Sequence, residues 1–132
     1  MNEPPNKRIV VIEDNPPDVL LLEVALQEAG VEFDLVSLGD GEQARTYIHN
    51  GAPKEPPDLF LVDLNLPILS GIEVLELIRR EPSISNVPII VWSSIRDNKD
   101  LEPFGIKQFF TKPSSLEAFV QIGHVIREIL HQ

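Results

Sequence analysis

The sequence has no cysteine, so it can form neither a disulfide bond nor a thiolate metal site. This absence is typical of proteins from the reducing cytoplasm, and we expect a cytoplasmic location. Long apolar runs are also missing, because Glu23 and Glu28 interrupt the richest apolar stretch. The N-terminus lacks the basic and then apolar layout of a signal peptide, and residues 1–6 are predicted to be a short disordered tail. We therefore expect no membrane association.

Basic residues are scarce. Lys and Arg number 11 against 21 Asp and Glu, which gives a formal net charge of -10. A chain this acidic repels nucleic acid phosphates unless it carries a local basic patch, and the sequence shows none, so no nucleic-acid binding is expected. The histidines are His49, His124 and His131. Because they are far apart in sequence, they predict surface or helix-end positions rather than a metal site.

The chain has 132 residues, 42% of them hydrophobic, which fits one domain (residues 7–132) with a sizeable core. Short apolar runs, rich in β-branched residues, alternate with segments of helical spacing. The predicted strands are 8–12, 33–38, 59–62, 88–92 and 106–111, and the predicted helices begin at 16, 40, 71 and 114. Such alternation implies an α/β fold with a parallel sheet and helices on both of its faces.

Local signals mark the ends of two helices. Pro16 and Pro17 suit the first turn of the first helix, where a missing N–H leaves no hydrogen bond unmade. Gly30 is a suitable C-terminal stop for the same helix. Ser114 and Glu117 form the S-x-x-E pattern of a capping box ahead of the last helix.

Reactive side chains follow four of the five strands. Glu13 and Asp14 follow the first, Asp63 the third, Ser93 the fourth and Lys112 the fifth. An acidic residue after a strand is more often part of a solvated turn. Together, however, these residues predict a site, because open parallel sheets bind ligands at the carboxyl ends of their strands.

The chemistry of this set is coherent. Carboxylates held close together repel each other and favour a cation, and Mg²⁺ prefers oxygen ligands with a phosphate. Asp63 can act as a nucleophile and form an aspartyl phosphate. Lys112 then supplies a compact positive charge and Ser93 a hydrogen-bond donor, so the set predicts in-line phosphoryl transfer.

Four segments carry a resemblance to a known family. They are IVVIEDNPPD, PDLFLVDLNLPILSG, PIIVWSS and FFTKP. With them, the chain from about Lys7 to Leu130 resembles the receiver domains of bacterial two-component response regulators. The EDNPPD and DLNLP segments are most similar to stand-alone receivers that partner phytochrome-type kinases. The resemblance implies a flavodoxin-like sheet of strand order 2-1-3-4-5.

The resemblance also implies a role for each matching residue. Asp63 corresponds to the phosphoacceptor, and Mg²⁺ is the implied metal. Ser93 corresponds to the switch hydroxyl and Phe109 to the aromatic switch residue, although Phe109 also fits a plain core aromatic. The remaining correspondences are Glu13 and Asp14 as the acidic metal-binding pair, Asn65 as the donor of a backbone carbonyl to the metal, and Lys112 as the invariant lysine, whose bond to Pro113 is expected to be cis.

Two features depart from the family pattern. Ser94 replaces a small apolar residue, and it either caps the next turn or adds a hydroxyl near the phosphate. The stretch between Ser93 and Lys112 is about one helical turn (about 3.6 residues) shorter than in typical receivers. Pro103 shortens any helix there further. We predict that the fourth helix is reduced to a turn or two and that the output surface differs from the usual one.

Three functions follow from these observations. The first is a phosphorylation switch that is not itself an enzyme, fed by a sensor histidine kinase or a histidine phosphotransfer protein, with output through protein contact. The second is a phosphorylation-independent adaptor, suggested by the short fourth helix. The third is a haloacid dehalogenase-like phosphohydrolase, but Asn65 stands where those enzymes need a second Asp. The oligomeric state is left open, including a homodimer.

Overall fold

The computed structural model describes residues 6–50, 54–94 and 101–132. It contains a five-stranded parallel sheet of order β2-β1-β3-β4-β5, which confirms the predicted topology. In chain order the elements are β1 (Lys7–Ile12), α1 (Pro16–Glu28), β2 (Phe33–Leu38), α2 (Gly41–Asn50), β3 (Leu59–Asp63), α3 (Gly71–Arg80), β4 (Ile89–Ser93), the 3-10 turn η1 (Glu102–Phe104), β5 (Gln108–Thr111) and α4 (Leu116–Leu130).

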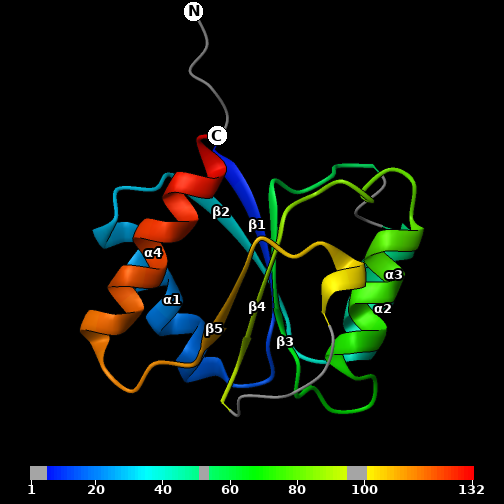
Figure 1. The fold of residues 1–132 in the computed structure, drawn as a ribbon, viewed down its shortest axis with the longest axis horizontal. Helices are drawn as coiled ribbons and strands as arrows, with labels where there is room; N and C mark the ends of the chain where they lie inside the picture. Colours follow the sequence, from blue (N-terminus) through cyan, green and yellow to red (C-terminus); the bar gives the residue numbers. More distant parts are fainter. Residues whose placement is uncertain (1–5, 51–53, 95–100) are drawn as a thin grey trace, which may run out of the picture.

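Helices cover both faces of the sheet. Figure 1 shows α1 and α4 on one face, and α2, α3 and η1 on the other. Side chains of a strand alternate between the two faces, so Ile9 and Val11 of β1 pack toward α1 and α4, while Val10 and Ile12 pack toward α2 and α3. Strands β1, β3 and β4 are therefore buried on both sides, which explains their continuous apolar sequences.

Helices α1 and α4 pack closely at one point. A Cβ atom added to Gly123 of α4 would lie only 2.4 Å from the backbone carbonyl oxygen of Ala25 in α1. Glycine is therefore the residue that lets the two helix backbones approach. On the sheet side of this pair, the rings of Trp92 and Phe119 meet edge to face with centroids 6.1 Å apart.

The expected ends of α1 are confirmed, and the expected cap of α4 is wrong. Pro16 begins α1, and Gly30, with φ of 77°, follows its last turn. At α4 the N-cap is Ser115 rather than Ser114, and its Oγ accepts a hydrogen bond of 3.2 Å from the Ala118 N–H. Ser115 has the extended backbone that a cap needs, so two adjacent serines left the sequence pattern ambiguous by one residue.

Two further expectations concern the Lys112–Pro113 bond and the stretch of the fourth helix. The bond between Lys112 and Pro113 is trans, so the expected cis bond is wrong. An X–Pro bond favours the trans isomer by about 0.5–1 kcal/mol. Where a fourth family helix was expected, the described residues of that stretch form the 3-10 turn η1 (Glu102–Phe104), and Gly105 follows it with φ of 60°. Residues 95–100, the rest of that stretch, lie outside the described part of the chain.

Residues 1–5 of the expected tail also lie outside the described residues. The side-chain amide of Asn6, which is described, donates a hydrogen bond of 3.4 Å to Asp34. Across the described parts, no helix has the length and apolar character needed to cross a membrane.

Candidate functional site

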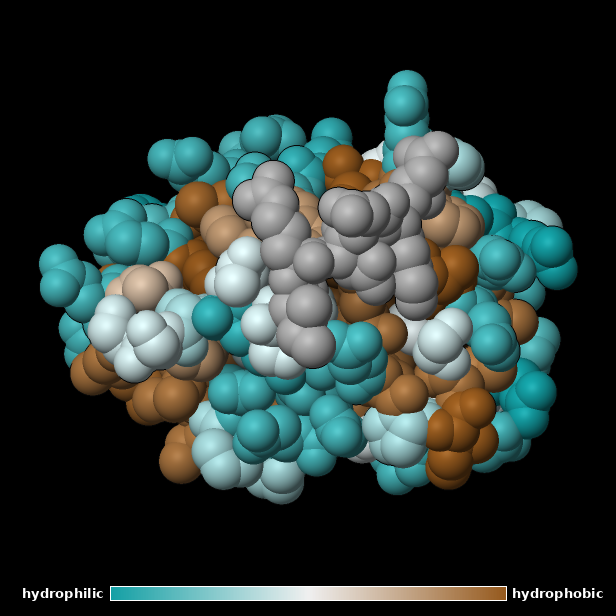
Figure 2. Space-filling model, turned by 60° about the horizontal axis from the view of Figure 1, so that its bottom comes forward, coloured by the Kyte–Doolittle hydropathy of each residue, from teal (hydrophilic) through white to brown (hydrophobic). Residues whose placement is uncertain are grey.

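The carboxyl ends of the strands meet at one edge of the sheet, at the bottom of Figure 1. Glu13 follows β1, Asp63 ends β3, Ser93 ends β4 and Lys112 follows β5. Figure 2 turns this edge toward the reader, and polar side chains gather in the lower middle of the face, while polar and apolar side chains are mixed on its flanks. The sheet thus brings together the residues that the sequence placed after separate strands.

Three carboxylates form the floor of the site. Glu13, Asp14 and Asp63 each offer an oxygen atom, and these atoms all lie within 4.8 Å of one another. Glu13 and Asp63 are each only 2% exposed, whereas Asp14 is exposed. Three acidic oxygens with access from solvent on one side fit a divalent cation that keeps part of its water shell.

The Lys112 ammonium lies among carboxylates. Its Nζ is 2.7 Å from Glu13 Oε1, 3.0 Å from Asp63 Oδ2 and 3.1 Å from Asp18 Oδ2. It also lies 5.6 Å from the centre of the Trp92 ring. Burial alone would lower the pKa of Lys112, but the three carboxylates around its ammonium outweigh this effect and raise the pKa above its ordinary value. Lys112 is therefore a permanent positive charge in the site.

Glu13 is the carboxyl group most affected by its surroundings. Burial raises its pKa to about 8 although the nearby Lys112 ammonium opposes the rise, and the nearby Asp63 charge adds to it. Glu13 Oε2 accepts a hydrogen bond of 3.1 Å from the Asn15 N–H. The buried Oε1 accepts none of standard geometry, although Lys112 Nζ is close. This oxygen is thus suited to a cation or to a water bound to one.

Asn65 connects Asp63 with Ser93. Its backbone N–H donates to Asp63 Oδ1 at 2.9 Å, and its side-chain amide donates to Ser93 Oγ, also at 2.9 Å. Ser93 is fully buried at the end of β4. The Ser93 hydroxyl therefore lies close to Asp63, and Asn65 bonds to both residues.

Comparison with known proteins gives the same picture as the geometry. Residues 9–123 match the family described as the response regulator receiver domain. The chain belongs to this family.

Three relatives show how close the match is. Response regulator Rcp1 of Synechocystis sp. is 31% identical over 100 residues, which are 74% of this chain and 68% of Rcp1. The crystal structure of the phosphorylated cyanobacterial phytochrome response regulator RcpA has a TM-score of 0.84 and 31% identity, covering 97% of this chain and 96% of that one. The DNA-binding response regulator MtrA of Mycolicibacterium smegmatis is 36% identical over 95 residues, but these are only 38% of MtrA.

The receiver fold does not decide the role of Phe109. This residue lies on β5, half-buried, and packs against the core cluster beneath α2 and α3. In the register of the sheet it pairs with Val91, two residues before Ser93. This position fits both a core aromatic and a switch residue, so the switch role stays a prediction, as does the metal ligation by the Asn65 carbonyl.

Asp18 is the site residue that sequence reasoning missed. It lies in the first turn of α1, and its backbone N–H donates a hydrogen bond of 3.1 Å to the carbonyl of Asn15. The available signal was an acidic residue in a helical first turn, a few residues after the Glu13 and Asp14 pair. That position is usually explained by the helix dipole alone, which conceals its contact with Lys112.

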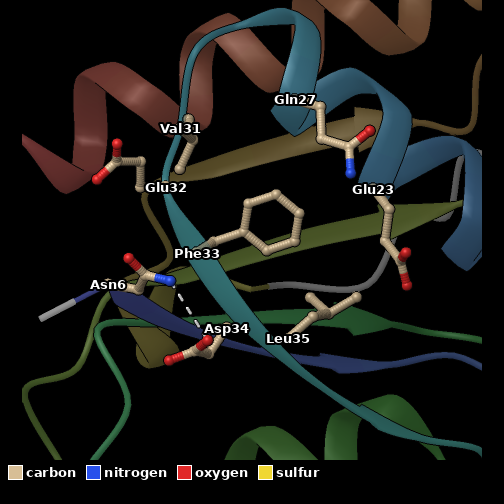
Figure 3. A pocket seen from close by; sticks show the side chains of 8 residues that line it. All are labelled: Asn6, Glu23, Gln27, Val31, Glu32, Phe33, Asp34 and Leu35. Carbon is tan, nitrogen blue, oxygen red and sulfur yellow. Dashed lines mark hydrogen bonds between the residues drawn. The ribbon is translucent and has the colours of Figure 1, made fainter.

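A separate groove lies on another part of the described surface. A shallow groove of about 740 Å³ runs along the free edge of β2, where Phe33 and Leu35 point toward Glu23 and Gln27 of α1 (Figure 3). None of the three clustered carboxylates lines it. The groove is therefore separate from the acidic cluster at the carboxyl ends of the strands.

Proposed function

We propose that this receiver domain is a phosphorylation switch in which Asp63 accepts a phosphoryl group from a phosphohistidine of a sensor histidine kinase or a histidine phosphotransfer protein. The observation that carries the proposal is the position of the Asp63 carboxylate. It is buried, lies 3.0 Å from the Lys112 ammonium, and shares a pocket with two further carboxylates.

The transfer step balances without any further reactant. An Asp63 oxygen attacks phosphorus, the bond between phosphorus and the histidine nitrogen breaks, and the imidazole leaves with the electron pair. Lys112 neutralises negative charge on the phosphoryl oxygens and on Asp63. Glu13, Asp14, Asp63 and the Asn65 carbonyl would hold Mg²⁺, which when bound supplies further positive charge at these oxygens.

The output is a shift between two conformations. Ser93 is the hydroxyl that would turn toward the phosphoryl group, and Phe109 would follow it on β5. We place the output in a contact with another protein. The short turn at residues 101–105 supports an output surface unlike that of ordinary receivers.

The relatives suggest the kind of kinase. RcpA is described as a phytochrome response regulator, and it matches this chain over nearly its whole length. We therefore propose a phytochrome-type sensor kinase as the phosphoryl donor. A manganese-bound structure of Rcp1, 26% identical to this chain, supports a divalent cation at the acidic site. The cytoplasmic location, the lack of nucleic-acid binding and a homodimer stay predictions.

The deciding experiment is the intact mass of the chain after incubation with acetyl phosphate and Mg²⁺, beside an Asp63→Asn variant. We expect the mass of one phosphoryl group to be added to the native chain only. If the folded native chain gains nothing, the switch is refuted and the adaptor hypothesis takes its place, with attention to the surface around residues 101–105. Sustained turnover of a phosphate ester would instead revive the phosphohydrolase hypothesis.

A further inference from the structure

Three carboxylates contact the Lys112 ammonium, and only two of them have a role in the proposed function. Glu13 and Asp63 belong to the cluster that would hold a cation. Asp18 does not belong to that cluster, yet its Oδ2 is 3.1 Å from Lys112 Nζ. Its side chain is 19% exposed and that of Lys112 only 13%, so their contact is largely shielded from water.

We propose that Asp18 is a positioning residue that holds Lys112 in the site when Asp63 and Glu13 turn to a divalent cation. This inference rests on the proposed function, and it assigns Asp18 a second effect. Because Asp18 shares the charge of the ammonium with the phosphoryl group, it weakens the contact between Lys112 and that group.

The geometry supports the first part of this role. An ammonium has three N–H donors, and here each of three carboxylates lies close to it. When a cation binds oxygen atoms of Glu13 and Asp63, Lys112 loses much of its interaction with both. Since Lys112 is mostly buried, an unpaired ammonium there would be strongly disfavoured. Asp18 leaves it one partner and so makes cation binding easier.

The placement of Asp18 is fixed by its local structure. Pro16 and Pro17 open α1, and the Asp18 N–H donates to the Asn15 carbonyl, so the first turn is rigid. Asp18 therefore presents its carboxylate from a different element than the cation ligands do. It can hold Lys112 without following the ligands when they rearrange.

The same contact sets the second effect. In the native chain the Lys112 ammonium would interact with both Asp18 and the phosphoryl oxygens. With asparagine at position 18, the full charge of Lys112 is available to the phosphoryl group. Removing the Asp18 charge should thus weaken Mg²⁺ binding and strengthen binding of a phosphoryl mimic. A merely structural role, or a favourable interaction with the helix dipole, would not move the two affinities in opposite directions.

The test uses the full chain with Asp18→Asn and Asp18→Glu variants. Trp92 is the only tryptophan, and it lies 5.6 Å from Lys112, so its fluorescence can report on binding. The first titration uses Mg²⁺ alone, and the second uses beryllofluoride at saturating Mg²⁺. A matched control is Glu117→Gln, which removes an exposed first-turn charge from α4 instead.

We expect Asp18→Asn to weaken Mg²⁺ binding and to strengthen beryllofluoride binding, each by about threefold, the scale of one partly shielded charge pair. Asp18→Glu and Glu117→Gln should stay near the native values. A Lys112→Gln background should shrink the effect of Asp18→Asn on Mg²⁺ binding, since the role acts through Lys112. Unchanged affinities, or a loss in both titrations together, would overturn the proposal.

Failure of the proposed function has a different signature. In that case the native chain itself would not respond to beryllofluoride at saturating Mg²⁺. The Mg²⁺ titration and its Lys112→Gln background would still decide whether Asp18 positions the ammonium.

Discussion

The Asn65 side-chain amide donates a hydrogen bond of 2.9 Å to the hydroxyl oxygen of Ser93. If Ser93 is the switch hydroxyl, this bond stabilises its resting position. Asn65→Ala removes the bond and keeps the backbone carbonyl, so we expect beryllofluoride to bind about fivefold more tightly, the equivalent of one net hydrogen bond of about 1 kcal/mol. Asn86→Ala, at an exposed asparagine in the turn before β4, is the matched control and should change nothing. Weaker or unchanged binding to Asn65→Ala would argue against a resting role for this bond.

A cation should stabilise the folded domain through the three clustered carboxylates. Binding to the folded state alone raises stability by mass action. Millimolar Mg²⁺ should therefore raise the melting temperature of the native chain more than that of Asp63→Asn, as measured by circular dichroism. Equal shifts in the two proteins would show that the cation acts outside the proposed site.

The raised pKa of Glu13 predicts how the stability of the metal-free domain depends on pH. Its folded-state pKa is raised to about 8 by burial, above the ordinary 4.5 of an unfolded chain. Between these values the folded state binds more protons than the unfolded state, so stability falls as pH rises. The slope approaches at most about 1.4 kcal/mol per pH unit for one proton. Asp63, Asp14 and Asp18 face the same pocket as anions, and Lys112 is the opposing cation.

The measurement is urea unfolding in EDTA from pH 5 to pH 8, for the native chain and for Glu13→Gln. Glutamine keeps the shape of the side chain but cannot ionise, so the slope should flatten in that variant. Identical slopes would mean that the pH dependence arises from other groups.

Arg79 joins α3 to the 3-10 turn η1 and to the turn that precedes β4. Its guanidinium donates to the carbonyls of Phe104 at 2.7 Å, Ser85 at 2.9 Å and Val87 at 2.8 Å. Arg79→Met keeps the apolar stem but leaves these carbonyls without their donor, and we expect a loss of about 2 kcal/mol in unfolding free energy. Arg80→Met is the control, because the Arg80 side chain is 79% exposed and its ion pair with Glu76 is long, at 4.0 Å. A similar loss in both variants would refute the bridging role.

The sequence was sufficient for the parts of the fold that rest on periodicity. Strands β1, β3 and β4 are buried on both faces, so their unbroken apolar runs identified them, and parallel topology then placed Asp63 and Lys112 at one edge. Glu13, Asp63, Ser93 and Lys112 lie together in the structure because each of them ends or follows a strand. The phosphoacceptor, switch and metal-binding roles assigned to the site stay predictions.

The features that the sequence did not predict depend on contacts between elements or on the backbone angles of single residues. Asp18 acts through Lys112, which is distant in sequence, and no local pattern reveals that pairing. Ser114 and Ser115 offer the same cap chemistry, and only the backbone angles chose between them. Likewise, the carbonyl partners of Arg79 are backbone groups, which carry no sequence signal.

Ile68, five residues after Asp63, has φ of 71°, a conformation that a β-branched residue rarely adopts. The Leu69 N–H donates to the Pro67 carbonyl at 2.8 Å around it, so the backbone makes a tight γ-turn. The Ile68 side chain is 79% exposed and gains little from packing. Asparagine tolerates this region better, and we expect Ile68→Asn to raise the unfolding free energy by about 1 kcal/mol.

The comparison for Ile68→Asn is Ile68→Val, which keeps the branched Cβ and so should keep the strain. Urea unfolding of the three proteins measures the difference directly. If Ile68→Asn proves no more stable than Ile68→Val, then the isoleucine side chain does not strain the turn. In that case no functional reason is needed to explain why an isoleucine stands there. If the gain is found, the domain retains a destabilising apolar residue in the loop that follows Asp63. That makes Ile68→Asn the natural variant for testing whether a kinase partner contacts this loop, because a loss of phosphotransfer in a more stable protein could not be a folding defect.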